Sequence, residues 1–244
     1  LPARMTGAVL FADISGFTPL TEALVLELGS RRGAEEMTRH INNVYQALIS
    51  TLHRYGGAVI SFSGDAITCW LRADDGRRAT ACALAMQTAM RNFADVRTVS
   101  GRTISLGVKV AVAVGTVRRF TVGLEAHGFI ETMAGQLLSH VARAEAVAER
   151  GEVVLHHSAV VPIQAHLQIS EWRDALFAVV TDLDLDVAET PWPALADAAV
   201  PDAEIRRRLL PSVYKRLQRG QGEFLAELRP IVALFVRFAD LDYD

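Results

Sequence analysis

The sequence predicts an α+β fold in which a ferredoxin-like βαββαβ sheet carries helices on one face. Two observations predict this fold. Short apolar runs with strand character alternate with longer helical segments, in the order strand, helices, strand, strand, helix, strand. In addition, residues 105–115 alternate valine with lysine or alanine at period two, which is typical of a strand with two different faces.

The first strand is expected at Gly7–Ile14, an apolar run that ends in a polar turn. Thr18 is predicted to be an N-cap with Pro19 at the first helical position, so a helix should follow directly. The glycines within residues 29–33 interrupt this helix. A second helix, with apolar residues at helical spacing, is expected over residues 34–55.

Two apolar segments, Ala58–Ser63 and Ala66–Arg72, flank Gly64-Asp65 and predict a β-hairpin with that turn. A strand at 117–122 is expected to pair with the strand at 105–115. The other predicted elements are helices at 75–93, 136–149 and 202–219, and strands at 153–156, 167–170 and 176–181.

The chain is expected to divide into three parts. Residues 1–181 should form one domain, which is an ordinary size for a single domain. Residues 182–227 are interpreted as a linker that contains a helix, because residues 182–202 are rich in Asp, Ala and Pro. Residues 228–244 hold another apolar segment, in which a strand should begin at Ile231.

Composition excludes several classes of function. The 244 residues carry a net charge of −3 with both signs mixed, which is not the basic footprint of a nucleic-acid binder. No apolar run reaches the roughly 18 residues of a membrane segment, and residues 1–12 do not resemble a signal peptide. Cys69 and Cys82 are too few for a disulfide framework and should pack in the core. A cytoplasmic protein is expected.

Asp13 and Asp65 are candidate functional residues. Asp13 ends the first strand, just before a Gly-containing turn into a helix, where free backbone N–H groups favour anions. Asp65 lies in the predicted hairpin turn. In a ferredoxin-like sheet we expect the first strand between the third and the second, so that its end meets this turn. Each aspartate alone fits an ordinary turn, but two carboxylates together suit Mg²⁺ and a triphosphate.

The motifs FADISGFT at 11–18 and FSGDA at 62–66 resemble the signature of class III adenylyl and guanylyl cyclases. The similarity covers about residues 4–181 and is closest to the first cyclase half of the bicarbonate-responsive soluble adenylyl cyclase group. The resemblance implies a palm-type cyclase sheet. It also implies conversion of ATP, or less favourably GTP, to a 3′,5′-cyclic nucleotide and pyrophosphate.

The resemblance assigns roles to the residues of these motifs. Asp13 and Asp65, with the backbone carbonyl of Ile14, would hold two Mg²⁺ or Mn²⁺ ions. One ion would promote loss of the ribose 3′-OH proton and the other would bind the triphosphate. The β- and γ-phosphates would lie against Ser15, Gly16, Phe17 and Thr18.

Further positions match the family in part. Lys109 matches a basic residue that acts on the terminal phosphates; the alternative is an edge lysine whose stem covers apolar surface. Its face of the strand is otherwise alanine, which would leave room for a ligand. Thr132 aligns with a base-reading position and Arg143 with a transition-state arginine. Two positions depart from the family, because Ser61 replaces a base-reading lysine and Ser139 replaces a ribose-positioning asparagine.

These departures imply that a second cyclase half of the same longer chain completes the active site. Bicarbonate control would need a basic residue near Ser61, so the serine argues against it. Residues 227–238 resemble the start of that second half, with Arg237 or, in a competing register, Asp240 at the metal position. The isolated chain is then expected to be a nearly inactive monomer or weak homodimer.

Two other functions are alternatives for this chain. One is a catalytically weak, cyclase-like module that binds nucleotide or a partner domain. The other is a diguanylate cyclase, which the hairpin sequence SGDA at 63–66 disfavours because that family carries a GGDEF-like turn.

Overall fold

The structure is a computed structural model that describes residues 3–124, 128–194, 196, 200–220, 232 and 234. The strands are β1 (Ala3–Ser15), β2 (Ala58–Ser63), β3 (Ala66–Arg72), β4 (Asp95–Arg97), β5 (Thr103–Ser105), β6 (Gly107–Leu124), β7 (Gly128–Ala134), β8 (Val153–His156), β9 (Leu167–Arg173) and β10 (Phe177–Leu183). The helices are α1 (Phe17–Arg54), α2 (Arg77–Met90), α3 (Gln136–Ala146), α4 (His157–Val160), α5 (Asp202–Arg208) and α6 (Pro211–Gln218), with 3-10 turns η1 (Arg91–Phe93) and η2 (Val161–His166).

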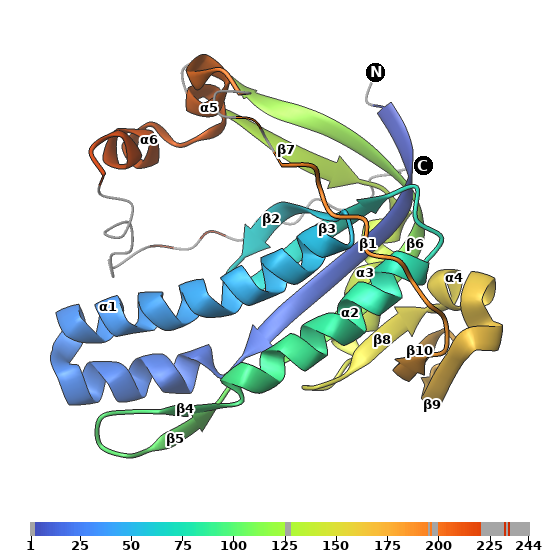
Figure 1. Cartoon of the computed structure of the whole chain (residues 1–244), viewed down its shortest axis with the longest axis horizontal. Helices are drawn as coiled ribbons and strands as arrows, with labels where there is room; N and C mark the ends of the chain where they lie inside the picture. Colours follow the sequence, from blue (N-terminus) through green and yellow to red (C-terminus); the bar gives the residue numbers. More distant parts are fainter. Residues whose placement is uncertain are drawn as a thin grey trace.

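A central sheet with strand order β2-β3-β1-β6-β8-β10-β9 organises the described residues, and β7 pairs with β6 outside this path (Figure 1). The first four of these strands with α1 and α2 form the predicted ferredoxin-like βαββαβ unit, so the α+β class is confirmed. One expectation about the order is wrong. β1 lies between β3 and β6, not between the third and second strands, because the β2–β3 hairpin joins the sheet through β3.

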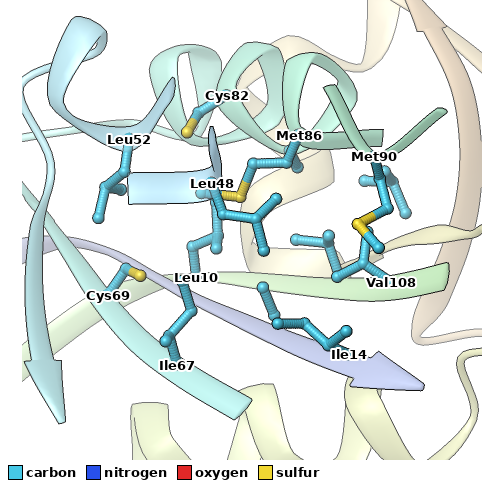
Figure 2. Packing of buried hydrophobic residues seen from close by; sticks show 14 of the residues in the cluster. Leu10, Ile14, Leu48, Leu52, Ile67, Cys69, Cys82, Met86, Met90 and Val108 are labelled. Carbon is cyan, nitrogen blue, oxygen red and sulfur yellow. The ribbon is translucent and has the colours of Figure 1, made fainter. Parts of the chain in front are cut away.

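Two apolar layers cover the two faces of this sheet, because successive side chains of a strand point to opposite faces. Leu10 and Ile14 of β1 face α1 and α2, where they pack with Leu48 and Met86 (Figure 2). Val9 of β1 belongs to the second layer, on the opposite face.

Helix α3, which follows the βαββαβ unit, covers this second face, whereas the two helices of the unit, α1 and α2, share the first face as expected. The buried α3 residues Leu137, Val141 and Ala144 pack against the alanines of β6. Ala111 and Ala113 are at most 1% exposed there, so the small side chains that were expected to leave room for a ligand make room for α3 instead.

The long strand β6 corrects a second expectation. Residues 105–115 and 117–122 were predicted as two paired strands, but residues 107–124 form one continuous strand whose hairpin partner is β7. Gly115 is not a turn residue. A Cβ atom at this position would lie 3.3 Å from the Leu137 side chain, so the glycine permits the close approach of α3.

The helix boundaries follow local backbone chemistry. α1 begins at Phe17 after the left-handed Gly16, so the predicted N-cap at Thr18 is wrong. The predicted interruption is confirmed, because Gly29 has non-helical φ and ψ angles of 79° and 165° and α1 folds back as two arms (Figure 1). The predicted helix at 202–219 is divided into α5 and α6, since Pro211 keeps Leu210 extended.

The segment after β10 was predicted as a linker, and part of it packs on the domain. The Trp192 indole N–H donates to the Gly57 carbonyl at 2.6 Å, and Arg54 pairs with Glu189 at 3.0 Å. The short β4–β5 hairpin was not predicted. The strand expected from Ile231 and the two registers at Arg237 and Asp240 lie outside the described residues, apart from Val232 and Leu234.

Candidate active site

The end of β1 places Asp13 beside two neighbouring strands. Asp13 pairs in register with Ala66 of β3 and with Lys109 of β6. Its neighbours Ala12 and Ile14 are buried in the α1–α2 layer, so the alternation of the strand turns the Asp13 side chain toward the α3 face, where it is 26% exposed.

The β2–β3 turn brings Asp65 to this strand end. The backbone N–H of Ile14 donates to the Asp65 carbonyl at 3.4 Å, which joins the turn to β1. Gly64 takes φ of 63°, which suits glycine. On the other side of the turn, the Tyr45 hydroxyl of α1 donates to the Gly64 carbonyl at 3.2 Å. The turn that carries Asp65 is therefore held from both β1 and α1.

Lys109 faces both Asp13 and a carboxylate of α3. Its Nζ atom lies 3.5 Å from Oδ2 of Asp13 and 2.5 Å from Oε1 of Glu145. Because β6 lies between β1 and β8, Lys109 is not an edge lysine, and that alternative is wrong. Three charged side chains from three different elements thus meet at one end of the sheet.

Burial and charge shift the pKa values of these groups. Burial raises the pKa of Asp13, the Lys109 ammonium acts to lower it, and the nearby Asp65 carboxylate raises it again, so that the net direction is upward. Burial acts to lower the pKa of Lys109, but its ion pairs with Glu145 and Asp13 outweigh burial and leave that pKa raised. The Asp13 and Asp65 carboxylates therefore repel each other, an arrangement that a shared cation relieves.

The two aspartates fit a magnesium-type site. Among the described residues, no group of three or more His, Cys, Asp or Glu side chains could enclose a metal. Mg²⁺ does not require such a cage, because it commonly binds one or two carboxylates and completes its shell with water and substrate phosphates. The Lys109 ammonium, 3.5 Å from Asp13, already places a cation against one of the two carboxylates.

The residues predicted to contact phosphates lie at the start of α1. Ser15 is the last residue of β1, and its hydroxyl donates to the Gly107 carbonyl at 3.4 Å. Gly16 has φ of 102°, and a Cβ atom there would lie 2.5 Å from the Ser105 carbonyl oxygen, so only glycine fits this turn. Phe17 is buried and Thr18 is exposed. Because the Phe17 side chain is buried, this residue could contact a ligand only through its backbone.

A pocket of about 350 Å³ opens on the α3 face, next to the acidic residues. Phe11, Ile60 and Glu145 line it together with two residues of the sequence analysis, Ser61 and Thr132. Glu145 thus belongs both to the pocket and to the ion pair with Lys109.

Arg143 is not brought to this site. It lies over the Phe177 ring at 5.5 Å and 3.9 Å from the Asp174 carboxylate, with its side chain 55% exposed. Arg143 and Glu145 are two residues apart in α3, so their side chains lie on different sides of the helix.

Sequence reasoning missed Tyr45 and Glu145. Tyr45 follows the buried Val44 of α1, and its ring also packs edge-on against Phe62 at 5.4 Å. Glu145 lies four residues after the buried Val141, which is a signal that its side chain is on the inner face of α3. That signal could be used only once α3 was placed on this face of the sheet.

This fold and site define a family. Residues 4–174 match the family described as the adenylate and guanylate cyclase catalytic domain, and the chain belongs to it. Adenylate cyclase type 10 of Homo sapiens is 23% identical over 272 aligned residues, which cover 98% of this chain and 16% of that protein. The Rattus norvegicus protein is 24% identical over 61% of this chain and 9% of its own length. The chain thus spans less than a fifth of the length of these relatives.

Solved cyclase structures share the fold. The adenylyl cyclase CyaB from P. aeruginosa aligns with a TM-score of 0.61 and 22% identity, covering 76% of this chain and all of that one. The guanylyl cyclase domain of the RhoGC fusion protein from Blastocladiella emersonii gives a TM-score of 0.60 and 16% identity with the same coverage. Within the described residues, no helix has both the length and the apolar character needed to cross a membrane.

Proposed function

We propose that this chain is the metal-binding half of an adenylate cyclase, which converts ATP to 3′,5′-cyclic AMP and pyrophosphate and is completed by a second cyclase half. The meeting of Asp13, the Asp65 turn and Lys109 at one end of the sheet carries the proposal. The adenylate cyclase type 10 relatives support ATP. GTP is the second candidate, since the structural neighbours include guanylyl cyclases.

Asp13, Asp65 and the Ile14 carbonyl would hold two divalent ions. When bound, Mg²⁺ or Mn²⁺ would acidify the ribose 3′-hydroxyl and neutralise phosphate charge. After its proton has passed to solvent, the 3′-oxygen would attack the α-phosphorus in line as the bond from that phosphorus to the pyrophosphate oxygen breaks. The carboxylates fix where the ribose oxygen and the triphosphate come together.

The start of α1 and Lys109 would hold the outer phosphates. The first backbone N–H groups of a helix have no partner within it, so those of Phe17 and Thr18 can donate to phosphate oxygens. The tight turn at Gly16 would let the β- and γ-phosphates approach this backbone, with Ser15 and the Thr18 hydroxyl at its rim. The Lys109 ammonium would offset the remaining negative charge.

The α3 face lacks groups that the family pattern uses for base and ribose, which supports completion of the active site by a second cyclase half. The pocket holds Thr132 at the base-reading position but Ser61 in place of a lysine, and Arg143 is turned away from Asp13. In this proposal Thr132 and Arg143 face a different nucleotide or regulatory site, formed with the partner half. Large apolar side chains of β2 and of the β6–β7 hairpin are exposed and would be covered by that partner: Phe62, Val122, Leu124 and Ile130.

The decisive experiment is an assay of the longer protein, which includes the second half, with ATP or GTP and Mg²⁺ or Mn²⁺. Cyclic AMP as the main product would support the proposal. Formation of cyclic GMP alone would instead identify a guanylate cyclase. Nucleotide binding without product would favour the alternative, a cyclase-like binding or regulatory module. Ser61 and Ser139 are consistent with this alternative, because they replace polar residues of the family pattern.

A cytoplasmic location is part of the same proposal. Cys69 and Cys82 are both buried and free, which fits a reducing compartment.

A further inference from the structure

The environment of Lys109 contains a carboxylate that the proposed reaction does not use. Glu145 lies on α3, and its Oε1 atom is 2.5 Å from the Lys109 ammonium, whereas Oδ2 of Asp13 is 3.5 Å away. The three side chains are between 24% and 26% exposed. Lys109 is therefore shared between two carboxylates, and it is closer to the one outside the predicted metal site.

Glu145 is fixed in this place by the packing of α3. Val141, one turn earlier on the same helix face, and Ala144 are buried against the sheet. The position of the carboxylate is thus set by the apolar contacts of the helix, while Lys109 and Asp13 come from adjacent sheet strands. A rigid helix on a rigid sheet is an arrangement that can hold a charged group in place.

Without Glu145, the ammonium would have one close carboxylate, Asp13. A direct Lys109–Asp13 pair would compete with a divalent cation for the same oxygen atoms. When a cation binds at Asp13, it repels the ammonium, which then needs another counter-ion because an unpaired, partly buried charge is unfavourable. Glu145 draws the ammonium away from the Asp13 oxygen atoms, and it supplies the counter-ion that Lys109 needs once a cation is bound.

Resting on the proposed function, we propose that Glu145 is a positioning residue that holds the Lys109 ammonium off Asp13. Asp13 is thereby kept available for a divalent cation, and the ammonium stays at the rim of the site, where outer phosphates would lie.

Mn²⁺ binding to the chain without nucleotide tests this inference. Glu145→Gln removes the charge and keeps the shape, so Lys109 should pair with Asp13 and the Kd for Mn²⁺, measured by calorimetry, should rise about three- to tenfold. Glu149→Gln is the matched control, because Glu149 is an exposed carboxylate shortly after α3 whose side chain has no described contact with Lys109. Its Kd should change by less than about twofold.

A double-mutant cycle shows whether Glu145 acts through Lys109. In a Lys109→Met background, Glu145→Gln should lose most of its effect on the Kd. Glu145→Asp, which keeps the charge on a shorter side chain, should give an intermediate Kd. Thermal unfolding of each variant checks that the fold is retained.

The outcomes separate this inference from the proposed function. An unchanged Kd in Glu145→Gln, or an equal effect in both backgrounds, would overturn the inference while leaving the metal site in place. Absence of Mn²⁺ binding by the unsubstituted chain would instead overturn the metal site, and this inference with it.

Discussion

Two neighbouring regions of the α3 face differ in how complete they are. At the end of β1, Asp13, the Asp65 turn and Lys109 converge from three separate stretches of the chain. In the adjoining pocket, Thr132 is present, but Ser61 and the exposed Ser139 replace larger polar residues of the family pattern, and Arg143 points elsewhere. The charged groups proposed to hold metal and phosphate are therefore together, whereas the groups that would hold base and ribose are not.

The groups missing from the pocket should be sought in a partner domain. A domain with a complete acidic site and an incomplete pocket fits a two-half enzyme in which each half faces the other.

Removing either carboxylate of the acidic site should have the largest effect. Asp13→Ala or Asp65→Ala in the longer protein should lower cyclase activity by at least about 10²- to 10³-fold, because one carboxylate fewer would weaken the hold on the divalent ions that are proposed to neutralise the phosphates. Cyclic nucleotide formed per minute is the measurement. Asp95→Ala, which removes an exposed carboxylate of β4, should keep full activity. Full activity in either site variant would refute the site assignment.

The incomplete pocket predicts that the 244-residue chain alone is nearly inactive. Two copies of it would pair good acidic sites with poor partner surfaces, and a 1 Å error in positioning can lower a rate about 10²-fold. Addition of the second half, fused or in trans, should raise turnover by at least about 10²-fold. Equal specific activity of the short and extended chains would show that Ser61 and Ser139 do not impair the domain.

Lys109 should distinguish ligands by their phosphate charge. Lys109→Ala should raise the Kd of a nucleoside triphosphate about tenfold, because the ammonium is proposed to face the outer phosphates, and that of the monophosphate by less than about twofold. Calorimetry on both ligands is the measurement, with Lys215→Ala of α6 as a control. Equal losses for the two ligands would indicate a defect of the fold.

The smallest effect concerns the stability of the metal-free chain. Since burial raises the pKa of Asp13 above its ordinary value of 3.8, its charged form disfavours the folded state. Asp13→Asn should therefore raise the unfolding temperature at pH 7 by about 1–3 °C. The gain should shrink as the pH falls toward 3.8, where Asp13 becomes protonated in the unfolded chain as well. Unfolding monitored between pH 7 and pH 4 in a chelator tests this.

A lower unfolding temperature of Asp13→Asn at pH 7 would contradict this sign. It would mean that the attraction between Asp13 and Lys109 outweighs the unfavourable burial of the carboxylate. Asp95→Asn, at an exposed position, should leave the unfolding temperature unchanged and serves as the control.

Local patterns predicted most of the secondary structure. The break at Gly29, the hairpin around Gly64-Asp65 and the strand at 153–156 are observed where they were expected. These features follow from backbone preferences and from the periodicity of apolar residues, both of which are visible within a few residues of sequence. The errors occurred where a distant element decides the role of a residue, as at Gly115, which meets α3 and not a turn.

Asp13, Asp65 and Lys109 could be recognised as candidate site residues without knowledge of the fold. The two aspartates lie at a strand end and in a turn that local patterns reveal, and Lys109 lies on an alternating strand and matches a basic residue of the family. The groups that surround these residues depend on the tertiary fold. α3 covers the second face and directs Glu145 toward Lys109 and Arg143 away from Asp13. Helical periodicity defines the faces of α3, but the side of the sheet that it covers depends on long-range packing against Ala111 and Ala113.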